Sequence, residues 1–303
     1  MPSTKTLPAI DVRSALPARS SRSRRRRVPF AKVVLTIVVS AGAVVMLYPL
    51  IWLAFASFKP ADEVFSSTAL LPQVWEWRNY ANGWAAVGSY SFGQYFRNSL
   101  FISALCVIGN ILACSLAAFA FGRLEFRFKK AAFVMMMATM MLPAQVTIIP
   151  QFILFHSWGW VNTYWPLILP KFFATDAFFI FLMVQFVRGI PRDLDAAAQI
   201  DGCNPFQIYW HIIMPLLRPA LVTTAIFTFL WTYNDFFSPL IYLSQTELFT
   251  VPLALRQFLD TSGQSMWGPM FAMSVLSLLP TIVIFAIFQR LIVEGISTSG
   301  MKG

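Results

Sequence analysis

The stretch DLDAAAQIDGCNPFQIYWHIIMPLLRP, residues Asp193–Pro219, decides how this chain is organised. It is polar and rich in turn residues, and it separates two long apolar runs. If both runs cross a bilayer, a segment between them must lie on one face of the membrane. The rest of the chain offers no group suited to catalysis. We therefore interpret this segment as the place where an external energy source or signal attaches.

Local signals in the first half of this segment predict a short helix. Pro191 favours a helix start, and Asp193 and Asp195 complement the positive end of the helix dipole. Ala196–Ala198 are strong helix formers with a small profile. Gly202 is placed to end the helix in a left-handed conformation.

The second half of the segment predicts another short helix at an angle to the first. Asn204 has the side chain of an N-cap, and Pro205 suits the first helical position. We expect this helix to run to about Ile213, with Pro215 and Pro219 marking the entry to the next apolar run. Such a helix pair on a membrane face has a shape that fits a groove on a partner protein.

Composition places the whole chain in the all-α class of polytopic membrane proteins. Hydrophobic residues make up 57% of the chain and charged residues 12%, against about 25% charged in soluble domains. The mean hydropathy is +0.64. Each apolar run is long enough for one crossing of about 20 residues, or for two separated by an aromatic turn. Six transmembrane helices are predicted, near residues 33–56, 98–122, 131–155, 167–187, 219–243 and 268–292.

Two of the predicted spans carry features beyond hydrophobicity. The third span holds Pro143 and Pro150, so it should be interrupted, with freed backbone carbonyls facing protein or water rather than lipid. The second span has a face of small residues that would let another helix approach closely. This face consists of Gly109, Ala113, Cys114, Ala117, Ala118 and Gly122.

Lysine and arginine predict the orientation and the domain limits. They gather in the N-terminal tail and in the loops after the second and fourth spans, which places both termini of a multi-pass membrane protein in the cytoplasm. Residues 1–30 are predicted to form a disordered basic tail, and residues 31–303 are predicted to form the membrane domain. The net charge of +10 reflects a lipid-facing cluster at Arg22–Arg27, and no basic aromatic surface indicates nucleic acid.

Several kinds of chemistry find no support in the sequence. There is no G-x-x-x-x-G-K-[ST] loop for ATP, no H-E-x-x-H motif and no cysteine–histidine cluster. The three cysteines, Cys106, Cys114 and Cys203, lack metal-ligand spacing. We expect a chain that is not an enzyme and that binds no cofactor or metal of its own.

Polar groups near the outer end of the fifth span have two open interpretations. Asn234 and Asp235 lie within an otherwise apolar stretch, where a carboxylate is costly and usually faces a cavity or a partner. They could contact a solute along a translocation path, together with Trp231, Tyr233 and, from the third span, Gln145. Alternatively, they form a structural polar cap.

The 192–215 loop resembles the coupling-loop signature of ABC importer permeases, E-A-A-x3-G-x9-I-x-L-P. The matching residues are Ala197, Ala198, Gly202, Ile212 and Pro215, and Met214 stands at the leucine position. The signature glutamate falls on Ala196, with Asp195 one residue earlier. A shift of one residue turns a helical side chain by about 100°, so whether Asp195 replaces the glutamate is open.

Further stretches resemble the carbohydrate-uptake permeases of the maltose type. They comprise Ile200–Gly202 (IDG), Pro215–Leu221 (PLLRPAL), Trp231–Pro239 and Phe288–Gly303 (FQRLIVEGISTSGMKG). The C-terminal tail, residues 293–303, is similar to that of the second permease subunit in such systems. The resemblance implies that this tail reaches the ATPase dimer through Ser299, Gly300, Met301, Lys302 and Gly303.

The resemblance also implies a location in the bacterial inner membrane, partners and a mechanism. The partners would be a second permease subunit, two ATPase subunits that carry ATP and magnesium, and an extracytoplasmic sugar-binding protein. The chain would then form half of the path for an oligosaccharide or disaccharide. An importer of the same superfamily for a non-sugar solute such as glycerol-phosphate stays open, and an ion-coupled secondary carrier is a more distant alternative because few ionisable groups lie in the spans.

Overall fold

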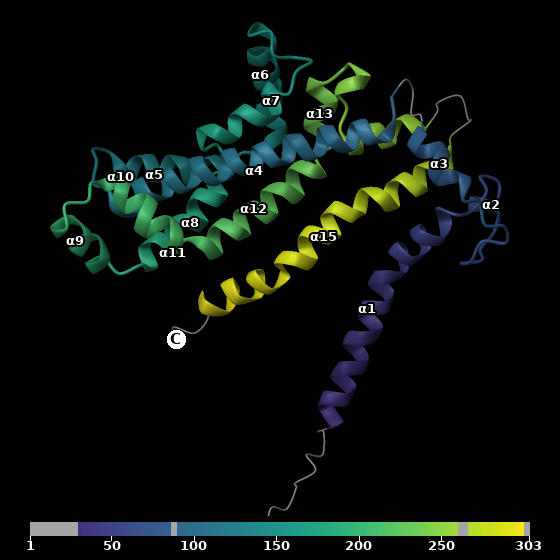
Figure 1. The fold of residues 1–303 in the computed structure, drawn as a ribbon, viewed down its shortest axis with the longest axis horizontal. Coiled ribbons are helices and arrows are strands. Elements are labelled where there is room, and N and C mark those ends of the chain that lie inside the picture. Colours follow the sequence, from purple (N-terminus) through teal and green to yellow (C-terminus); the bar gives the residue numbers. More distant parts are fainter. Residues whose placement is uncertain (1–29, 86–89, 260–265, 300–303) are drawn as a thin grey trace, which may run out of the picture. The chain divides into compact units, whose positions relative to one another are not determined.

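The computed structural model describes the backbone of residues 30–85, 90–259 and 266–299, and these ranges contain helices and no strand (Figure 1). The all-α prediction is therefore confirmed for the described part of the chain. The helices longer than ten residues are α1 (Phe30–Ala56), α4 (Phe92–Arg123), α5 (Lys129–Thr139), α6 (Ala144–Ser157), α8 (Ala177–Gly189), α12 (Arg218–Tyr233) and α15 (Trp267–Ser299). The shorter α-helices are α2 (Glu63–Ser66), α3 (Arg78–Ala85), α7 (Trp165–Ile168), α9 (Asp193–Ile200), α10 (Pro205–Ile208), α11 (Met214–Leu216), α13 (Phe237–Tyr242) and α14 (Val251–Leu255). Single 3-10 or π-helical turns are η2 (Leu169–Phe173), η3 (Tyr209–Ile213), η4 (Thr246–Leu248) and η5 (Arg256–Phe258).

Contacts divide the chain into two units, Met1–Pro49 and Leu50–Gly303. The described part of the first unit is most of α1, whose apolar side chains, such as Leu35 and Met46, are exposed. An apolar helix without charge from Val34 to Ala56 is suited to contact with lipid. The second unit holds all the other helices and the sites described below.

The second unit is built around α4, which packs against α8 and α12. Its small residues allow this close packing, as the sequence predicted. A Cβ atom on Gly109 would lie 2.5 Å from the ring of Phe172, and one on Gly122 would overlap Val187. Cys114 and Ala118 on the same face are fully buried. The helices α8 and η2 can therefore lie directly against the backbone of α4.

Four of the six predicted spans coincide with helices that are long and apolar enough to cross a membrane. Among the described residues these are Val34–Ala56, Phe92–Arg123, Trp165–Gly189 and Trp267–Gln289. A fifth candidate is the pair Pro205–Leu216 and Arg218–Tyr233, which is bent by 76°. The chain is thus a multi-pass membrane protein.

The other two predicted spans are not single helices, and this corrects their description. The stretch 131–155 consists of α5 and α6, which Pro143 separates because proline cannot donate a backbone hydrogen bond and restricts the residue before it. The predicted interruption at Pro143 is confirmed, whereas Pro150 lies inside α6.

In the stretch 219–243, α12 ends at Tyr233. The Oδ1 atom of Asp235 then accepts hydrogen bonds from the backbone N–H groups of Phe237 and Ser238, at 3.0 and 3.1 Å. These bonds start the separate helix α13, because a side-chain acceptor competes with continuation of the helix.

Candidate functional site

The α9–α11 segment, Asp193–Leu216, lies at the C-terminal end of α4, whereas α3 lies toward the other end of that helix (Figure 1). Its shape follows from local hydrogen bonds. Gly202 follows α9 with φ +82°, as the sequence predicted. Its N–H donates to Gln199 at 3.1 Å, and the N–H of Cys203 donates to Ala198 at 2.9 Å. This pair of bonds is a Schellman motif, which fixes how the chain leaves the helix.

The start of α10 is fixed in the same way. The Asn204 side chain accepts from the N–H of Gln207 at 2.9 Å, and the Gln207 side chain accepts from the N–H of Asn204 at 2.8 Å. Pro205 occupies the first helical position. This reciprocal capping box satisfies two N–H groups that would otherwise lack partners at a helix start, and the predicted N-cap is confirmed.

The end of the segment differs in part from the prediction. The predicted single helix to Ile213 is instead α10 followed by the π-helical turn η3 and by α11. The N–H of Met214 bonds to Tyr209, five residues back. Pro215 next to it has no N–H to donate, and this favours a locally rearranged bonding pattern. Ile212 is half-buried and packs on the core, whereas Pro215 is exposed.

Two polar contacts hold the segment to α4. The Nε atom of Arg123, at the end of α4, lies 2.9 Å from Oδ2 of Asp195, with side-chain exposures of 5% and 15%. A second guanidinium nitrogen donates to the carbonyl of Ile190 at 2.7 Å. The hydroxyl groups of Ser115 and Tyr209 are 2.8 Å apart. Asp195 therefore pairs within the chain, so the acidic residue nearest to the missing signature glutamate is held against α4.

The outer surface of the segment is formed by small and apolar side chains. Ala196 and Ala197 are exposed, and Ala198 is buried in the core. Large apolar side chains flank the alanines, and Ile200 is 87% exposed. The others are Leu194, Phe206, Trp210 and Leu216. Exposed alanines flanked by large apolar side chains form a surface that suits close contact with another protein.

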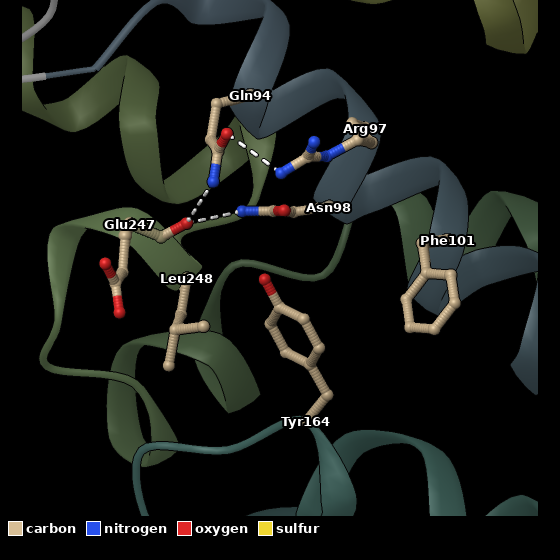
Figure 2. A pocket seen from close by; sticks show the side chains of 7 residues that line it. All are labelled: Gln94, Arg97, Asn98, Phe101, Tyr164, Glu247 and Leu248. Atoms are coloured by element: carbon tan, nitrogen blue, oxygen red, sulfur yellow. Dashed lines mark hydrogen bonds between the residues drawn. The ribbon is translucent and has the colours of Figure 1, made fainter.

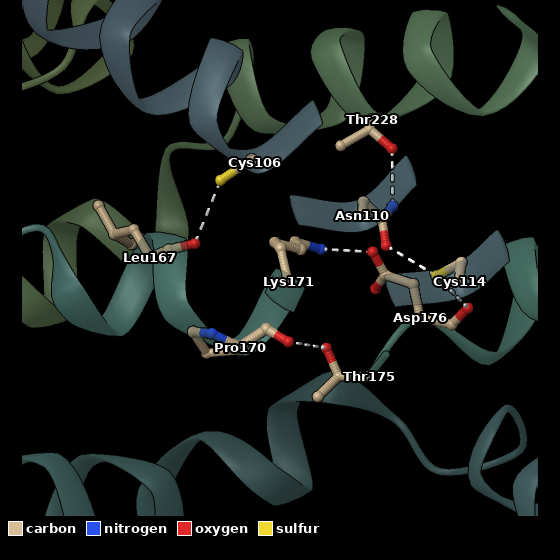
Figure 3. A network of polar contacts seen from close by, with 9 residues as sticks. All are labelled: Cys106, Asn110, Cys114, Leu167, Pro170, Lys171, Thr175, Asp176 and Thr228. Carbon is tan, nitrogen blue, oxygen red and sulfur yellow. Dashed lines mark hydrogen bonds and ion pairs between the residues drawn. The ribbon is translucent and has the colours of Figure 1, made fainter. Parts of the chain in front are cut away.

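A polar cavity of about 700 Å³ lies among α4, α5, α6, α8, α12 and α13. Of the residues proposed for a translocation path, Trp231 and Asp235 line it. The cavity also brings in Lys171 and Asp176, whose side chains pair at 2.8 Å. Figure 3 shows this pair between η2 and the start of α8. Both residues lie near the start of the predicted fourth span, and nothing in their spacing predicts that they line the same cavity as Asp235.

The remaining path candidates lie outside the cavity lining. Tyr233 is buried, Asn234 is exposed and bonds to the carbonyl of Leu230 at 2.8 Å, and Gln145 is exposed on α6. The Oδ1 atom of Asp235 caps α13, which confirms the structural interpretation for this residue. Asp235 also lines the cavity, and its contact with a solute stays a prediction.

A buried polar network joins α4 to α12 (Figure 3). The Asn110 side chain on α4 donates to Thr228 on α12 at 2.8 Å and accepts from Cys114 at 3.0 Å. Asn110 is fully buried. Sequence reasoning missed this residue, although a lone asparagine in a charge-free run is a signal for a bond between spans.

A smaller pocket of about 400 Å³ lies near the N-terminal end of α4 (Figure 2). The side chains of Gln94 and Asn98 both donate to the backbone carbonyl of Glu247, at 3.2 and 2.8 Å, and so fasten η4 to α4. A hydrogen bond from Tyr90 to the Glu247 carboxylate, at 3.1 Å, raises the pKa of Tyr90.

No group of three or more acidic, cysteine or histidine side chains able to hold a metal occurs among the described residues. Ser299 is the last described residue, and the tail from Gly300 to Gly303 lies outside the described residues.

Residues 109–298 match the family described as "Binding-protein-dependent transport system inner membrane component". The chain belongs to this family. A probable ABC transporter permease of Bacillus subtilis is 33% identical to this permease over 84% of each chain. The arabinooligosaccharide transport permease of Halalkalibacterium halodurans is 31% identical and covers 92% of this chain and 100% of its own. The trehalose/maltose transport permease of Thermococcus litoralis is 30% identical and covers 90% and 97%.

Solved structures share the fold of this permease. One chain of a bacterial ABC transporter that imports the acidic polysaccharide alginate superposes with a TM-score of 0.75 and 22% identity, covering 86% of this permease and 95% of that chain. A chain of the alginate transporter in complex with an alginate-bound periplasmic protein superposes with a TM-score of 0.56 and 13% identity, covering 86% and 96%. The fold and the family agree with the expected class of ABC importer permease.

Proposed function

We propose that this permease forms half of the translocation path for an oligosaccharide or disaccharide and couples to partner ATPase subunits through the α9–α11 segment. The observation that carries this proposal is the exposed small face at Ala196 and Ala197, closed by the Gly202 turn. The match of this turn to the signature glycine of the family supports the assignment. ATP and magnesium would be bound by the ATPase subunits, and this chain would carry out no catalysis.

The proposed complex also contains a second permease subunit and an extracytoplasmic sugar-binding protein. Relatives named for arabinooligosaccharide and trehalose/maltose transport support a sugar as the solute. The basic loops support an inner-membrane protein with both termini in the cytoplasm. Closure of the ATPases would move α9–α11 as a unit, because its caps and its contacts with α4 make it rigid. The permease pair would then alternate between inward- and outward-facing states.

The charges of the polar cavity favour an uncharged solute over an anion such as glycerol-phosphate. Its lining holds one cation, Lys171, and two carboxylates, Asp176 and Asp235. The cation is already paired with Asp176. An anionic solute would therefore meet an excess of negative charge, whereas sugar hydroxyl groups could bond to these side chains and a sugar ring could stack on Trp231.

Site-directed cross-linking tests the coupling assignment. Ala197→Cys in a Cys203→Ser background places a thiol on the exposed face of α9, and we expect it to cross-link to the ATPase subunits in membranes. Ser157→Cys, at the exposed end of α6, is a matched control and should not cross-link. Equal cross-linking of the two variants would rule out the proposed contact.

Uptake of labelled saccharides into proteoliposomes that contain the complete importer tests the solute class. We expect ATP-dependent uptake of a neutral disaccharide or oligosaccharide. Uptake of glycerol-phosphate without uptake of any sugar would overturn this part of the proposal and leave the coupling assignment intact.

A further inference from the structure

A third cavity, of about 830 Å³, lies where α4 ends, α5 begins and α8 ends, and none of its lining residues belongs to the polar cavity or to the α9–α11 segment. We call it the basic pocket. Its charged lining residues are Glu125, Lys129, Lys130 and Arg188. Its principal apolar lining residues are Phe121, Phe126, Phe128, Phe133 and Val134. A cationic and aromatic pocket at the ends of membrane helices is not explained by the coupling function.

The charges of the basic pocket are only partly compensated. Lys129 donates to Glu125 at 3.0 Å and to the carbonyl of Leu124 at 2.7 Å, and the bond from Lys129 lowers the pKa of Glu125. This carboxylate therefore stays ionised and offsets one cation. Lys130 and Arg188 have no carboxylate partner within the described residues, and the Arg188 guanidinium lies 5.3 Å from the centre of the Phe133 ring. Two positive charges of the pocket thus remain available to an anion.

The apolar side of the pocket is presented to the surroundings. Phe126 and Val134 are exposed, and Phe128 is 70% exposed. Phe128 also has φ 63° directly before α5, a left-handed conformation that is rare for a bulky residue. The backbone is held in a disfavoured state, and the Arg127 guanidinium lies 4.9 Å from the centre of the exposed Phe128 ring, so a cation and an apolar ring are presented together, which is a reason to look for a ligand there.

We propose that the basic pocket binds an anionic phospholipid, with the headgroup phosphate between Lys130 and Arg188 and the acyl chains along Phe126, Phe128 and Val134. Basic pockets between transmembrane helices on the cytoplasmic side bind such headgroups, and the exposed rings supply the apolar contact that a free phosphate ion does not need. The pocket adjoins the coupling junction, because Arg188 lies two residues before Ile190, whose carbonyl accepts from Arg123.

Titration of the detergent-purified full chain with fluorescent phosphatidylglycerol tests this proposal, with phosphatidylcholine of the same acyl chains as the neutral probe. We expect phosphatidylglycerol to bind at least tenfold more tightly. The double substitution Lys130→Gln and Arg188→Gln should weaken its binding about 25-fold, since each basic residue at a lipid surface contributes about fivefold. Binding of phosphatidylcholine should change little.

Arg218→Gln is the matched control, because Arg218 is an exposed arginine before the fifth span that does not line the pocket. It should bind phosphatidylglycerol like the unmodified chain. Equal affinity for the two lipids, or a double variant as tight as the unmodified chain, overturns the proposal. Size-exclusion profiles identify variants that do not fold, and for those the single substitutions Lys130→Gln and Arg188→Gln give the same test with about fivefold effects.

Two further measurements distinguish a bound lipid from a bound phosphate ion and test the acyl-chain contact. Inorganic phosphate at millimolar concentration should not displace the fluorescent lipid, and complete displacement would assign the pocket to free phosphate instead. Phe128→Gly relieves the left-handed backbone but removes the ring. A folded Phe128→Gly chain should bind both lipids several-fold more weakly, because the acyl chains lose their contact. Unchanged binding would reduce Phe128 to a structural role and contradict the acyl-chain contact.

Discussion

The α9–α11 segment and the polar cavity are built in opposite ways. The segment takes its shape from residues within a few positions of one another, such as the Gly202 turn and the Asn204 capping box. The cavity is lined by segments from α4 to α13 that lie far apart in the sequence, and its ion pair, Lys171–Asp176, shares the cavity with Asp235 only in the folded chain. A substitution that changes the backbone conformation should therefore have the largest effect on the α9–α11 segment. In the cavity, replacing a single side chain should be enough to change function.

The largest expected effect tests the backbone of the segment. Gly202→Val should abolish uptake by the assembled importer while the chain still inserts, because a β-branched residue at φ +82° is strained and breaks the Schellman motif. Open space surrounds the position, so the cause would be conformation rather than a clash. Uptake of a labelled saccharide and membrane fractionation measure the two outcomes.

Two variants calibrate this result. Gly202→Asn should keep a measurable part of the uptake, since asparagine tolerates the left-handed region. Gly189→Val changes a glycine that also has open space but no positive φ, and it should be much milder. Robust uptake by Gly202→Val would refute the coupling assignment.

The second effect tests whether the segment depends on its anchor to α4. Arg123→Ala or Asp195→Ala alone should lower the free energy of unfolding by about 2–3 kcal/mol, somewhat less than a fully buried pair, because Asp195 keeps 15% exposure. The double variant should lose less than the sum of the two, since it leaves no unpaired charge. Unfolding of the purified chain in detergent measures this cycle, and additive losses would mean that the ion pair does not stabilise the segment.

The third effect tests the cavity through one side chain. Asp235→Asn keeps the oxygen that caps α13 but removes the charge. We expect stability to change by less than about 1 kcal/mol and the KM for sugar uptake to rise about tenfold, as for the loss of one charged hydrogen bond to the solute. Asp235→Ala, which also removes the cap, should be less stable than Asp235→Asn. An unchanged KM for Asp235→Asn would leave Asp235 with the capping role alone.

The smallest effect concerns the missing signature glutamate. Ala196→Glu restores an acidic group on the exposed face of α9, where Asp195 is held inward by Arg123. We expect binding of the ATPase subunits to be preserved or strengthened by about 0.5–1 kcal/mol, in the range of an exposed ion pair. Co-purification of the complex measures it. Loss of assembly would show that this loop has diverged from the register of the family.

The sequence predicted those parts of the molecule that depend on neighbouring residues or on solvent. The helix ends at Gly202 and Asn204 follow from residues that satisfy backbone groups within the same few positions. The small face of α4 could be identified because glycine, alanine and cysteine recur with helical spacing. The interruption at Pro143 follows from the missing N–H of proline.

Other features could not be predicted from the sequence, because they depend on a local competition that hydropathy does not measure or on partners that are distant in the chain. The split of the fifth span at Asp235 resulted from competition between a side chain and the backbone, which hydropathy does not measure. Asn110 found its partner Thr228 on another helix. The direction of Asp195 depended on Arg123 at the end of α4.

The sequence by itself thus determined the class of the protein, most of its membrane helices and the form of the α9–α11 segment, because apolar length and helix caps act locally. Only the tertiary structure decided which charges meet. It turned Asp195 toward Arg123 and set Asp235 in the same cavity as the Lys171–Asp176 pair. Ionic and hydrogen-bond partners in a helical membrane protein are chosen by how the helices pack, and no local pattern records that choice.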